Sequence, residues 1–365
     1  MKEIRFILFY FFMNLIIIDT NSISIQNYSN NIYINFIDYS YSKTLCFENE
    51  SNNNFNVISR NFEYCRICAK AKKKKKKTKK LKYCKKCNIK EIIREIKIMS
   101  PEETLDEIIY NNKSISRFGD GELNLIFGFK IGFQKYDEIL SKRLYDVLQT
   151  NEKDFLIGMP DPLDFENLDK YTDRSKKYWT KWIENNIFEL ILILNEKKTY
   201  YSSYITRFYI LYKDKSKVYK YVEKLKKIWN KKDSVIIEGQ QSRRGVNNSL
   251  FDNVKSIKRI LCPSENAFNI YDKILNFALK IEKNKLILLA LGPTATVLAY
   301  DLYKAGYQAI DIGHVDIEYE WFIRNSTEKT RIPNKYVNEI KDGNMNITNV
   351  TDNEYYNQII ETILN

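Results

Sequence analysis

The feature that most constrains the fold is an apolar run that passes directly into a helix-forming segment, within residues 286–306. The run 286–291 is entirely aliphatic, which is typical of a strand buried on both faces of a sheet. Gly292 and Pro293 then end the strand and open a helix, because proline is well tolerated in the first helical turn. Gly306 stands where glycine commonly ends a helix. This unit predicts an α/β fold.

Similar alternation extends over most of residues 98–340. Short apolar runs predict strands, and amphipathic segments predict helices between them. The pattern favours a mainly parallel sheet with helices on both faces. The predicted strands are 115–118, 154–158, 200–205, 234–238, 257–262, 286–291 and 309–312. The predicted helices are 101–110, 136–149, 179–194, 217–229, 264–281 and 294–304.

The positive charge is confined to one short segment. The chain has a formal net charge of +13, and residues 66–90 contain 13 Lys, one Arg and no acidic residue. The rest of the chain is therefore nearly neutral, so the body lacks the basic footprint of a nucleic-acid-binding domain. Nucleic acid is not the expected partner. The single histidine, His314, excludes a site built from several histidines of one chain.

The first 60 residues differ in texture from the rest. Residues 1–20 contain Lys2 and then, within 5–18, a mostly apolar run that suits a signal peptide or a short signal anchor. This run is shorter than the roughly 20 residues of a membrane span. If residues 1–20 act in targeting, we expect membrane association or a location in the secretory pathway. The alternative is an N-terminal extension without a targeting role, in a cytoplasmic protein. Residues 21–60 are expected to be a disordered linker.

Four cysteines flank a lysine tract in residues 61–92. Cys65, Cys68, Cys84 and Cys87 form two C-x2-C pairs with 15 residues between them, the spacing of a structural zinc site. Disulfides are the alternative in a secretory compartment, and the low complexity of the tract leaves a third interpretation, no ordered site. The charge of the segment would attract anionic lipid or RNA, or simply be solvated.

Asp120 and Glu122 form the first candidate site. Residues two apart on an extended segment point to the same side, so both carboxylates can converge on one cation. Mg²⁺ and Mn²⁺ take one or two carboxylates together with phosphate oxygens. Gly119 and Gly121 permit a close approach of ligand to backbone, and Arg117 can pair with a phosphate. The alternative is a glycine-rich turn whose acids cap the next helix.

A phosphate site is the second candidate, at the turn 292–296. Free backbone N–H groups at a helix start suit a phosphate or diphosphate, and the hydroxyls of Thr294 and Thr296 lie nearby. Ligands of open α/β sheets bind beyond the carboxyl ends of the strands, where this turn is expected. The fingerprint G-x-G-x-x-G is missing, which disfavours a nicotinamide enzyme. An ordinary turn without ligand is the alternative.

Acidic and basic side chains follow two further predicted strands. Residues 311–321 contain His314 and four acids, a density that indicates a metal ligand and a general base; the alternative is that Asp316 caps a helix within a solvated acidic face. Residues 238–252 contain Arg243 and Arg244, which suit phosphate or sugar hydroxyls. The alternative is a flexible surface loop. Arg207 is a weaker candidate of the same kind.

In this order, the segments resemble the bacterial GT-D-fold glycosyltransferase family, formerly a domain of unknown function. The similarity covers about residues 98–340, and nothing in residues 1–90 belongs to it. The phrases that carry it are RFGDGE at 117–122, SRRGVN at 242–247, CPSENA at 262–267, ALGPTAT at 290–296, DIGH at 311–314 and DIEYEW at 316–321.

The resemblance implies a Rossmann-like domain at 95–345, which leaves 346–365 as a tail helix. It also implies a nucleotide-sugar donor such as UDP-glucose and a divalent metal, Mn²⁺ or Mg²⁺, at Asp120 and Glu122. Transfer of a hexose to a hydroxyl of a glycan or glycoprotein acceptor is the implied reaction. The predicted donor contacts are Arg117, Gly119, Arg243, Arg244, Asn247, Gly292, Pro293, Thr294 and Thr296.

The implied chemistry suits these residues. The diphosphate leaving group gains negative charge, which a metal, a helix start and an arginine would stabilise. Asp316 or Glu320 would take the acceptor proton, with His314 as a further contact. The rival interpretation is a binding protein whose zinc-ribbon and lysine-tract module docks on nucleic acid or membrane, beside a degenerate transferase domain. The presence of Asp120, Glu122 and His314 favours the enzyme.

Overall fold

The computed structural model describes residues 96–341, 343, 347–348 and 352–364, apart from the side chains of 165–167 and 188, and the backbone of four strands within residues 5–36. The chain divides into two units, Met1–Asn88 and Ile89–Asn365. In the first unit the described strands form two antiparallel pairs, β1 (Arg5–Phe9) with β2 (Leu15–Asp19) and β3 (Ile23–Tyr28) with β4 (Asn31–Phe36).

Several predictions for the N-terminal part stay predictions. The targeting role of residues 1–20 is untested, and the expected linker 21–60 contains β3 and β4. The cysteines and the lysine tract of 61–92 lie outside the described residues, as does any zinc site among them. Within the described part of the chain, no helix combines the length and apolar character needed to cross a membrane.

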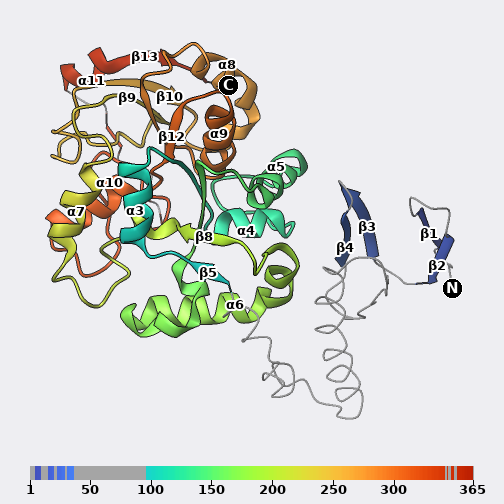
Figure 1. The fold of residues 1–365 in the computed structure, drawn as a ribbon. Coiled ribbons are helices and arrows are strands. Elements are labelled where there is room, and N and C mark those ends of the chain that lie inside the picture. Colours follow the sequence, from blue (N-terminus) through green and yellow to red (C-terminus); the bar gives the residue numbers. More distant parts are fainter. Residues whose placement is uncertain are drawn as a thin grey trace. The chain divides into compact units, whose positions relative to one another are not determined.

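The described residues of the second unit form a nine-stranded sheet at its centre, and all neighbouring strands of that sheet are parallel. Figure 1 shows this sheet between the helices. The predicted parallel α/β architecture is therefore confirmed. In the order β13-β10-β9-β11-β12-β6-β7-β8-β5, the strands are β5 (Lys97–Ile98), β6 (Ser114–Arg117), β7 (Phe155–Met159), β8 (Thr199–Ser202), β9 (Asp233–Gly239), β10 (Ser256–Cys262), β11 (Leu286–Ala290), β12 (Gln308–Asp311) and β13 (Ile359–Thr362).

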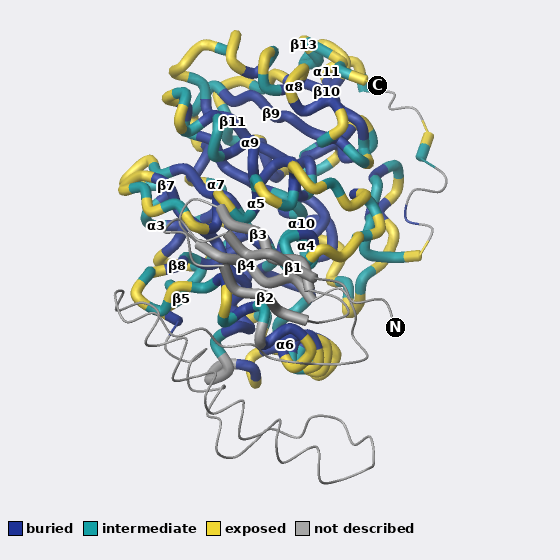
Figure 2. Tube along the Cα trace, turned by 90° about the vertical axis from the view of Figure 1, so that its right-hand side faces the viewer, coloured by how far each residue is buried: buried dark blue, intermediate teal, exposed yellow. Residues whose placement is uncertain are grey.

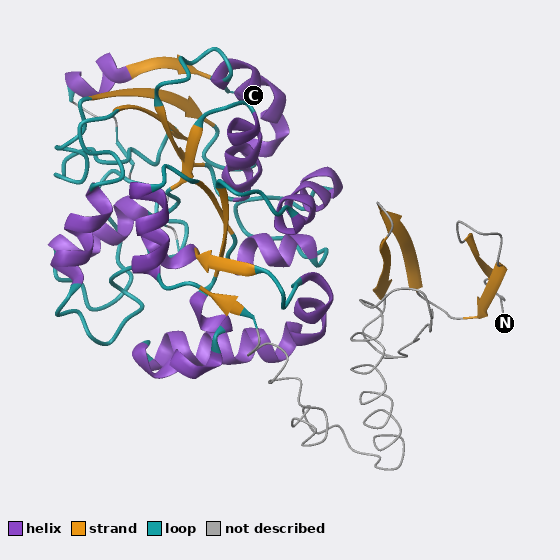
Figure 3. Cartoon of the chain, viewed as in Figure 1, coloured by secondary structure: helices purple, strands orange, loops and turns teal. Residues whose placement is uncertain are grey.

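Helices cover both faces of the sheet (Figure 3), because successive side chains of a strand point to opposite faces. In β11, Ile287 and Leu289 pack into one apolar cluster, and Leu286 and Leu288 into the other. The first cluster includes α4 (Asp120–Ile126), α5 (Glu138–Gln149), α6 (Asp173–Ile193), α8 (Tyr271–Ala278) and α9 (Pro293–Lys304). The second includes α3 (Pro101–Tyr110), α7 (Val218–Lys226) and α10 (Val315–Ile323). Figure 2 shows the central strands as the buried interior.

The direction of strand addition reverses between β6 and β12. From β6 the sheet continues outward through β7 and β8, whereas β9 to β12 lie on the other side of β6. In open parallel sheets, such a reversal opens a crevice beyond the carboxyl ends of the strands, and ligands bind there. Arg117 and Asp311 end the two strands at this point.

Several predicted elements end differently in the structure. The strand expected at 200–205 stops at Ser202, whose hydroxyl caps the 3₁₀ turn η3 (Ser203–Thr206). The helix expected at 264–281 starts late, as η4 (Ala267–Ile270) and α8, because Asn266 has a left-handed backbone with φ of 53°. The tail, expected to be a helix, is α11 (Asn353–Gln358) followed by the edge strand β13.

Two more 3₁₀ helices, η1 (Asp161–Leu163) and η2 (Phe165–Lys170), precede α6.

Candidate active site

The carboxyl ends of the central strands surround a cavity of about 770 Å³, a size that suits a small-molecule ligand. Its walls come from the β6–α4 segment and the loop after α4, from α6, and from the segments that follow β8, β9, β10, β11, β12 and α10. Of the predicted site residues, those that line it are Arg117, Gly119, Asp120, Glu122, Arg244, Gly292 and His314. Those absent from its lining are Arg243, Asn247, Pro293, Thr294, Thr296, Asp316 and Glu320.

Arg117 ties together three segments beside the cavity. Its Nε donates to the Asp311 carbonyl at 2.7 Å, and its Nη2 pairs with the Asp311 carboxylate at 3.2 Å. Nη1 donates to the Ser203 carbonyl and the Thr206 hydroxyl, at 3.0 and 2.6 Å. Gly313 has φ of 40°, and a Cβ there would overlap Nη2. The guanidinium of Arg117 thus holds the frame of the site, and its predicted contact with a phosphate stays a prediction.

Asp120 and Glu122 lie in the first turn of α4, so the prediction that they share one side of an extended segment is wrong. Residues two apart in a helix point in different directions. Glu122 caps the helix by accepting a hydrogen bond from the Gly119 N–H at 2.7 Å, and burial raises the pKa of Glu122 to about 7. Asp120 accepts a hydrogen bond from the Tyr178 hydroxyl of α6. Both residues still line the cavity.

Whether Asp120 and Glu122 can hold a divalent metal depends on which other ligands the metal has. Among the described residues, no group of three or more His, Cys, Asp and Glu side chains could hold a metal ion. Mg²⁺ and Mn²⁺ accept one or two carboxylates when phosphate oxygens and water complete the shell. Asp120 and Glu122 do not suffice for a metal held by protein side chains alone; a metal at these carboxylates would need the oxygens of a bound diphosphate and water to complete its shell.

His314 belongs to a charged cluster that also lines the cavity. Its Nδ1 lies 3.2 Å from Arg207 Nη2, and its Nε2 lies 2.6 Å from Asn338 Oδ1 and 3.2 Å from the Glu339 carboxylate. Burial, together with the charge of Arg207, lowers the pKa of His314 to about 3. The ring is therefore neutral at pH 7. Because Arg207 can only donate, Nδ1 accepts and Nε2 carries the proton.

Glu339 is a functional candidate that sequence reasoning missed. Its carboxylate lines the cavity and pairs with Arg207 and Lys329. Burial alone would raise the pKa of Glu339, but the charge of Arg207 and the adjacent groups hold it well below its ordinary value. The residue comes from the loop that follows α10, where no periodic pattern marks it. The sequence shows that residue 339 is acidic, but it does not show that this residue lies at the cavity.

Arg244 lines the cavity with a side chain that is only partly paired. The residue is only 6% exposed, and its Nε and Nη1 have no hydrogen-bond partner among the described residues. Burial lowers the pKa of Arg244, although Asp316 and Glu238 oppose this effect. A buried cation without a hydrogen-bond partner is costly, so a bound water or anion beside Arg244 would lower that cost. The prediction for Arg244 thus has geometric support, whereas Arg243 turns away and donates to the Asn334 carbonyl at 2.9 Å.

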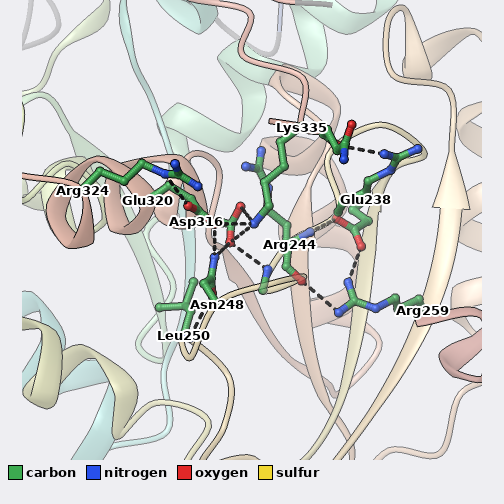
Figure 4. A network of polar contacts seen from close by, with 12 residues as sticks. Glu238, Arg244, Asn248, Leu250, Arg259, Asp316, Glu320, Arg324 and Lys335 are labelled. Carbon is green, nitrogen blue, oxygen red and sulfur yellow. Dashed lines mark hydrogen bonds and ion pairs between the residues drawn. The ribbon is translucent and has the colours of Figure 1, made fainter. Parts of the chain in front are cut away.

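Asp316 and Glu320 belong to a buried polar network (Figure 4), and neither of these two residues lines the cavity. Lys335 Nζ contacts Asp316 Oδ2 at 2.9 Å and Glu320 Oε1 at 3.0 Å. The Asn248 amide donates to both carboxylates, at 2.8 and 2.7 Å. A general base has to face the acceptor, so this placement does not support their predicted proton-accepting role. The network instead fastens the loop that follows β9 to α10.

The turn 292–296 is only partly open to a ligand. Gly292 lines the cavity with φ of 55°, but a Cβ there would overlap the ring of Phe133, which covers the turn closely. The Thr296 hydroxyl donates to the Arg117 carbonyl at 3.1 Å. The Thr294 hydroxyl is fully buried. The predicted phosphate cradle therefore reduces to Gly292 at the edge of the site.

An all-parallel sheet, with a cavity at its point of reversal that presents a buried cation, acids and a neutral histidine, is the architecture of nucleotide-dependent α/β enzymes. The model of the family described as "Glycosyltransferase GT-D fold" matches residues 115–340. The chain belongs to this family.

The relatives agree with this membership. The "Probable glycosyl transferase Gly" of Streptococcus gordonii is 38% identical over 272 residues, which are 74% of this chain and 39% of that protein. The "Glycosyltransferase GlyD" of Streptococcus pneumoniae is 38% identical over 271 residues, which are 74% of this chain and 33% of that protein. The chain thus matches well under half the length of these curated relatives.

Solved structures share the fold. The structure described by the words "The highly conserved domain of unknown function 1792 has a distinct glycosyltransferase fold" is 41% identical, with a TM-score of 0.72, over 76% of this chain and 98% of that one. "A New Glycosyltransferase (DUF1792) from Streptococcus sanguinis" is 36% identical, with a TM-score of 0.70, over 73% of this chain and 99% of that one.

Proposed function

We propose that this domain transfers a hexose from a nucleotide sugar, such as UDP-glucose, to a hydroxyl of a glycan or glycoprotein acceptor. The observation that carries the proposal is the buried guanidinium of Arg244, whose Nε and Nη1 have no partner among the described residues. A diphosphate would supply the missing acceptors, since charged arginine–phosphate hydrogen bonds are short and strong. Family membership indicates that this diphosphate belongs to a sugar donor.

Asp120 and Glu122 are the residues that would hold Mn²⁺ or Mg²⁺ together with the donor phosphates. Bound there, the metal would supply positive charge that stabilises the leaving diphosphate. Asp120 can reach such an ion only when its carboxylate is shared with, or released from, the Tyr178 hydroxyl. Glu122 has to give up its proton, because burial raises its pKa to about 7.

The reaction also needs a group that accepts the proton of the attacking hydroxyl. Asp316 and Glu320 lie outside the cavity lining, and Asp120 and Glu122 are assigned to the metal. Glu339 is the carboxylate that we assign to this role, beside the neutral His314. Its low pKa makes it a weak base, so the donor phosphates have to draw Arg207 or Lys329 away from it as they bind.

The proposal is tested by incubating the full chain with a panel of nucleotide sugars and Mn²⁺ and measuring the nucleoside diphosphate released. We expect UDP release from a UDP-hexose, and a loss of at least about 100-fold in kcat/KM for Arg244→Ala, in line with removal of one transition-state donor. Arg174→Ala, which changes an exposed arginine of the same cavity wall, is the control for the general charge of the site.

Three outcomes would overturn parts of this proposal. Release that is undiminished by Arg244→Ala would remove the assigned diphosphate site. UDP binding without turnover of any sugar, in every metal tested, would favour the rival interpretation of a degenerate transferase domain. Undiminished turnover in EDTA would refute the metal assignment alone, because Arg244 acts independently of it.

A further inference from the structure

Buried charged side chains bind three successive backbone groups around Arg244 (Figure 4). Glu238, at 0% exposure, accepts a hydrogen bond from the Arg244 N–H at 2.8 Å. Arg259 Nη2 donates to the Arg244 carbonyl at 2.9 Å. Asp316 accepts a hydrogen bond from the Gly245 N–H at 2.8 Å. The backbone that carries the unpartnered guanidinium is therefore clamped from both sides.

Arg259 is the centre of this clamp and connects it to the C-terminal segment. Its Nη1 pairs with Glu238 Oε1 at 2.5 Å, and its Nε donates to Gln358 Oε1 at 2.7 Å. The ring centroid of Tyr355 lies 5.1 Å from its Cζ. Arg259 is 3% exposed and Tyr355 is 4% exposed, whereas Gln358 is half-buried. Two of its partners belong to α11, a helix outside the matched family region of residues 115–340.

The clamp has a physical reason. Arg244 carries a buried charge near two carboxylates, those of Glu238 and Asp316, and neither accepts a hydrogen bond from its Nε or Nη1. A flexible backbone would let the guanidinium turn toward one of them, because pairing lowers the cost of burying the charge. Both carboxylates are instead occupied by the backbone of the loop and by Arg259 and Lys335. Arg244 thus lines the cavity while its Nε and Nη1 stay without a hydrogen-bond partner among the described residues.

We propose that Arg259 and Gln358 are positioning residues for Arg244, so that the C-terminal helix α11 sets the affinity of the cavity for a diphosphate. The inference rests on the proposed function, because it takes Arg244 as the diphosphate ligand. Supporting groups that fix a ligand-binding side chain commonly change affinity by a large factor although they never touch the ligand.

The test uses the full chain and measures the Kd of UDP and of inorganic pyrophosphate by calorimetry. Arg259→Lys keeps the charge but cannot bind Glu238, the Arg244 carbonyl and Gln358 together, so we expect Kd to rise about tenfold or more. Gln358→Leu should raise Kd several-fold, whereas Gln358→Glu retains an acceptor for Nε and should leave it nearly unchanged. Asn357→Ala, at an exposed neighbour in the same helix, is the control.

A double-mutant cycle separates positioning from general destabilisation. In an Arg244→Ala background, Arg259→Lys and Gln358→Leu should have no further effect on Kd, because the side chain that they position is gone. An equal weakening in both backgrounds would overturn the inference, and so would an unchanged Kd in the single variants. If Arg244→Ala itself leaves Kd unchanged, the proposed function fails at this residue. Gln358→Leu keeps the test valid if Arg259→Lys does not fold.

Discussion

Arg117 and Asp311 end two neighbouring parallel strands, and their side chains pair at 3.2 Å where the strand order reverses. The side chains are 11% and 5% exposed. Burial raises the pKa of Asp311, and the Arg117 guanidinium opposes that shift. The pair joins the carboxyl ends of β6 and β12 at the position where the crevice for the ligand lies. The geometry of the site therefore depends on this pair.

Arg117→Met should lower the free energy of unfolding by about 3–5 kcal/mol, because it leaves the Asp311 carboxylate buried without its partner. The measurement is urea denaturation at pH 7. Arg143→Met is the matched control, since the Arg143–Asp301 pair is more exposed and should cost about 1 kcal/mol or less. Equal losses for the two variants would contradict the role given to Arg117.

Gly313→Ala should destabilise the protein more than Gly306→Ala does. Both glycines have positive φ, of 40° and 90°, so both substitutions carry the strain of a left-handed backbone, about 1 kcal/mol. A Cβ at Gly313 would in addition overlap Arg117 Nη2, whereas nothing lies within 4 Å of one at Gly306. Thermal denaturation of the two variants measures the difference. An equal decrease in Tm would show that Arg117 moves aside at little cost.

The neutral His314 should make the protein sensitive to acid. Its folded-state pKa, about 3, lies below the ordinary value, so the unfolded state binds the proton more readily. The stability from the neutral ring is complete above about pH 6.5 and decreases as the pH falls toward 3. Relative to His314→Gln, the wild-type free energy of unfolding should fall by about 1.4 kcal/mol for each pH unit between pH 6 and 4. Parallel pH profiles would refute this.

Asp316→Asn should act mainly on stability. Lys335 is 4% exposed and would keep only Glu320 as a charged partner, so we expect a loss of about 3–5 kcal/mol in the free energy of unfolding. Urea denaturation measures this loss, and Glu328→Gln, which changes an acid of the loop after α10, serves as the control. A variant with unchanged stability and an abolished kcat would restore Asp316 as a proton acceptor.

Much of the fold could be predicted from the chain because its determinants are local. The aliphatic run of β11 and the Gly292–Pro293 turn indicate a buried parallel strand followed by a helix, and the structure contains both. Helix α4 was missed as an element because it is short and begins at glycine-flanked acids, which suit an extended segment equally well. That local ambiguity is why the geometry of Asp120 and Glu122 was mispredicted.

The sequence by itself determined most of the strands and helices of the sheet domain, and which polar segments follow the strands, since both depend on apolar periodicity and turn residues. It could not decide which acid of such a segment faces the ligand. Asp316, Glu320 and Glu339 are equivalent as residue types, yet only Glu339 of the three lines the cavity. Tertiary structure made this choice, because Lys335 and the loop around Arg244, distant in the chain, enclose the other two carboxylates.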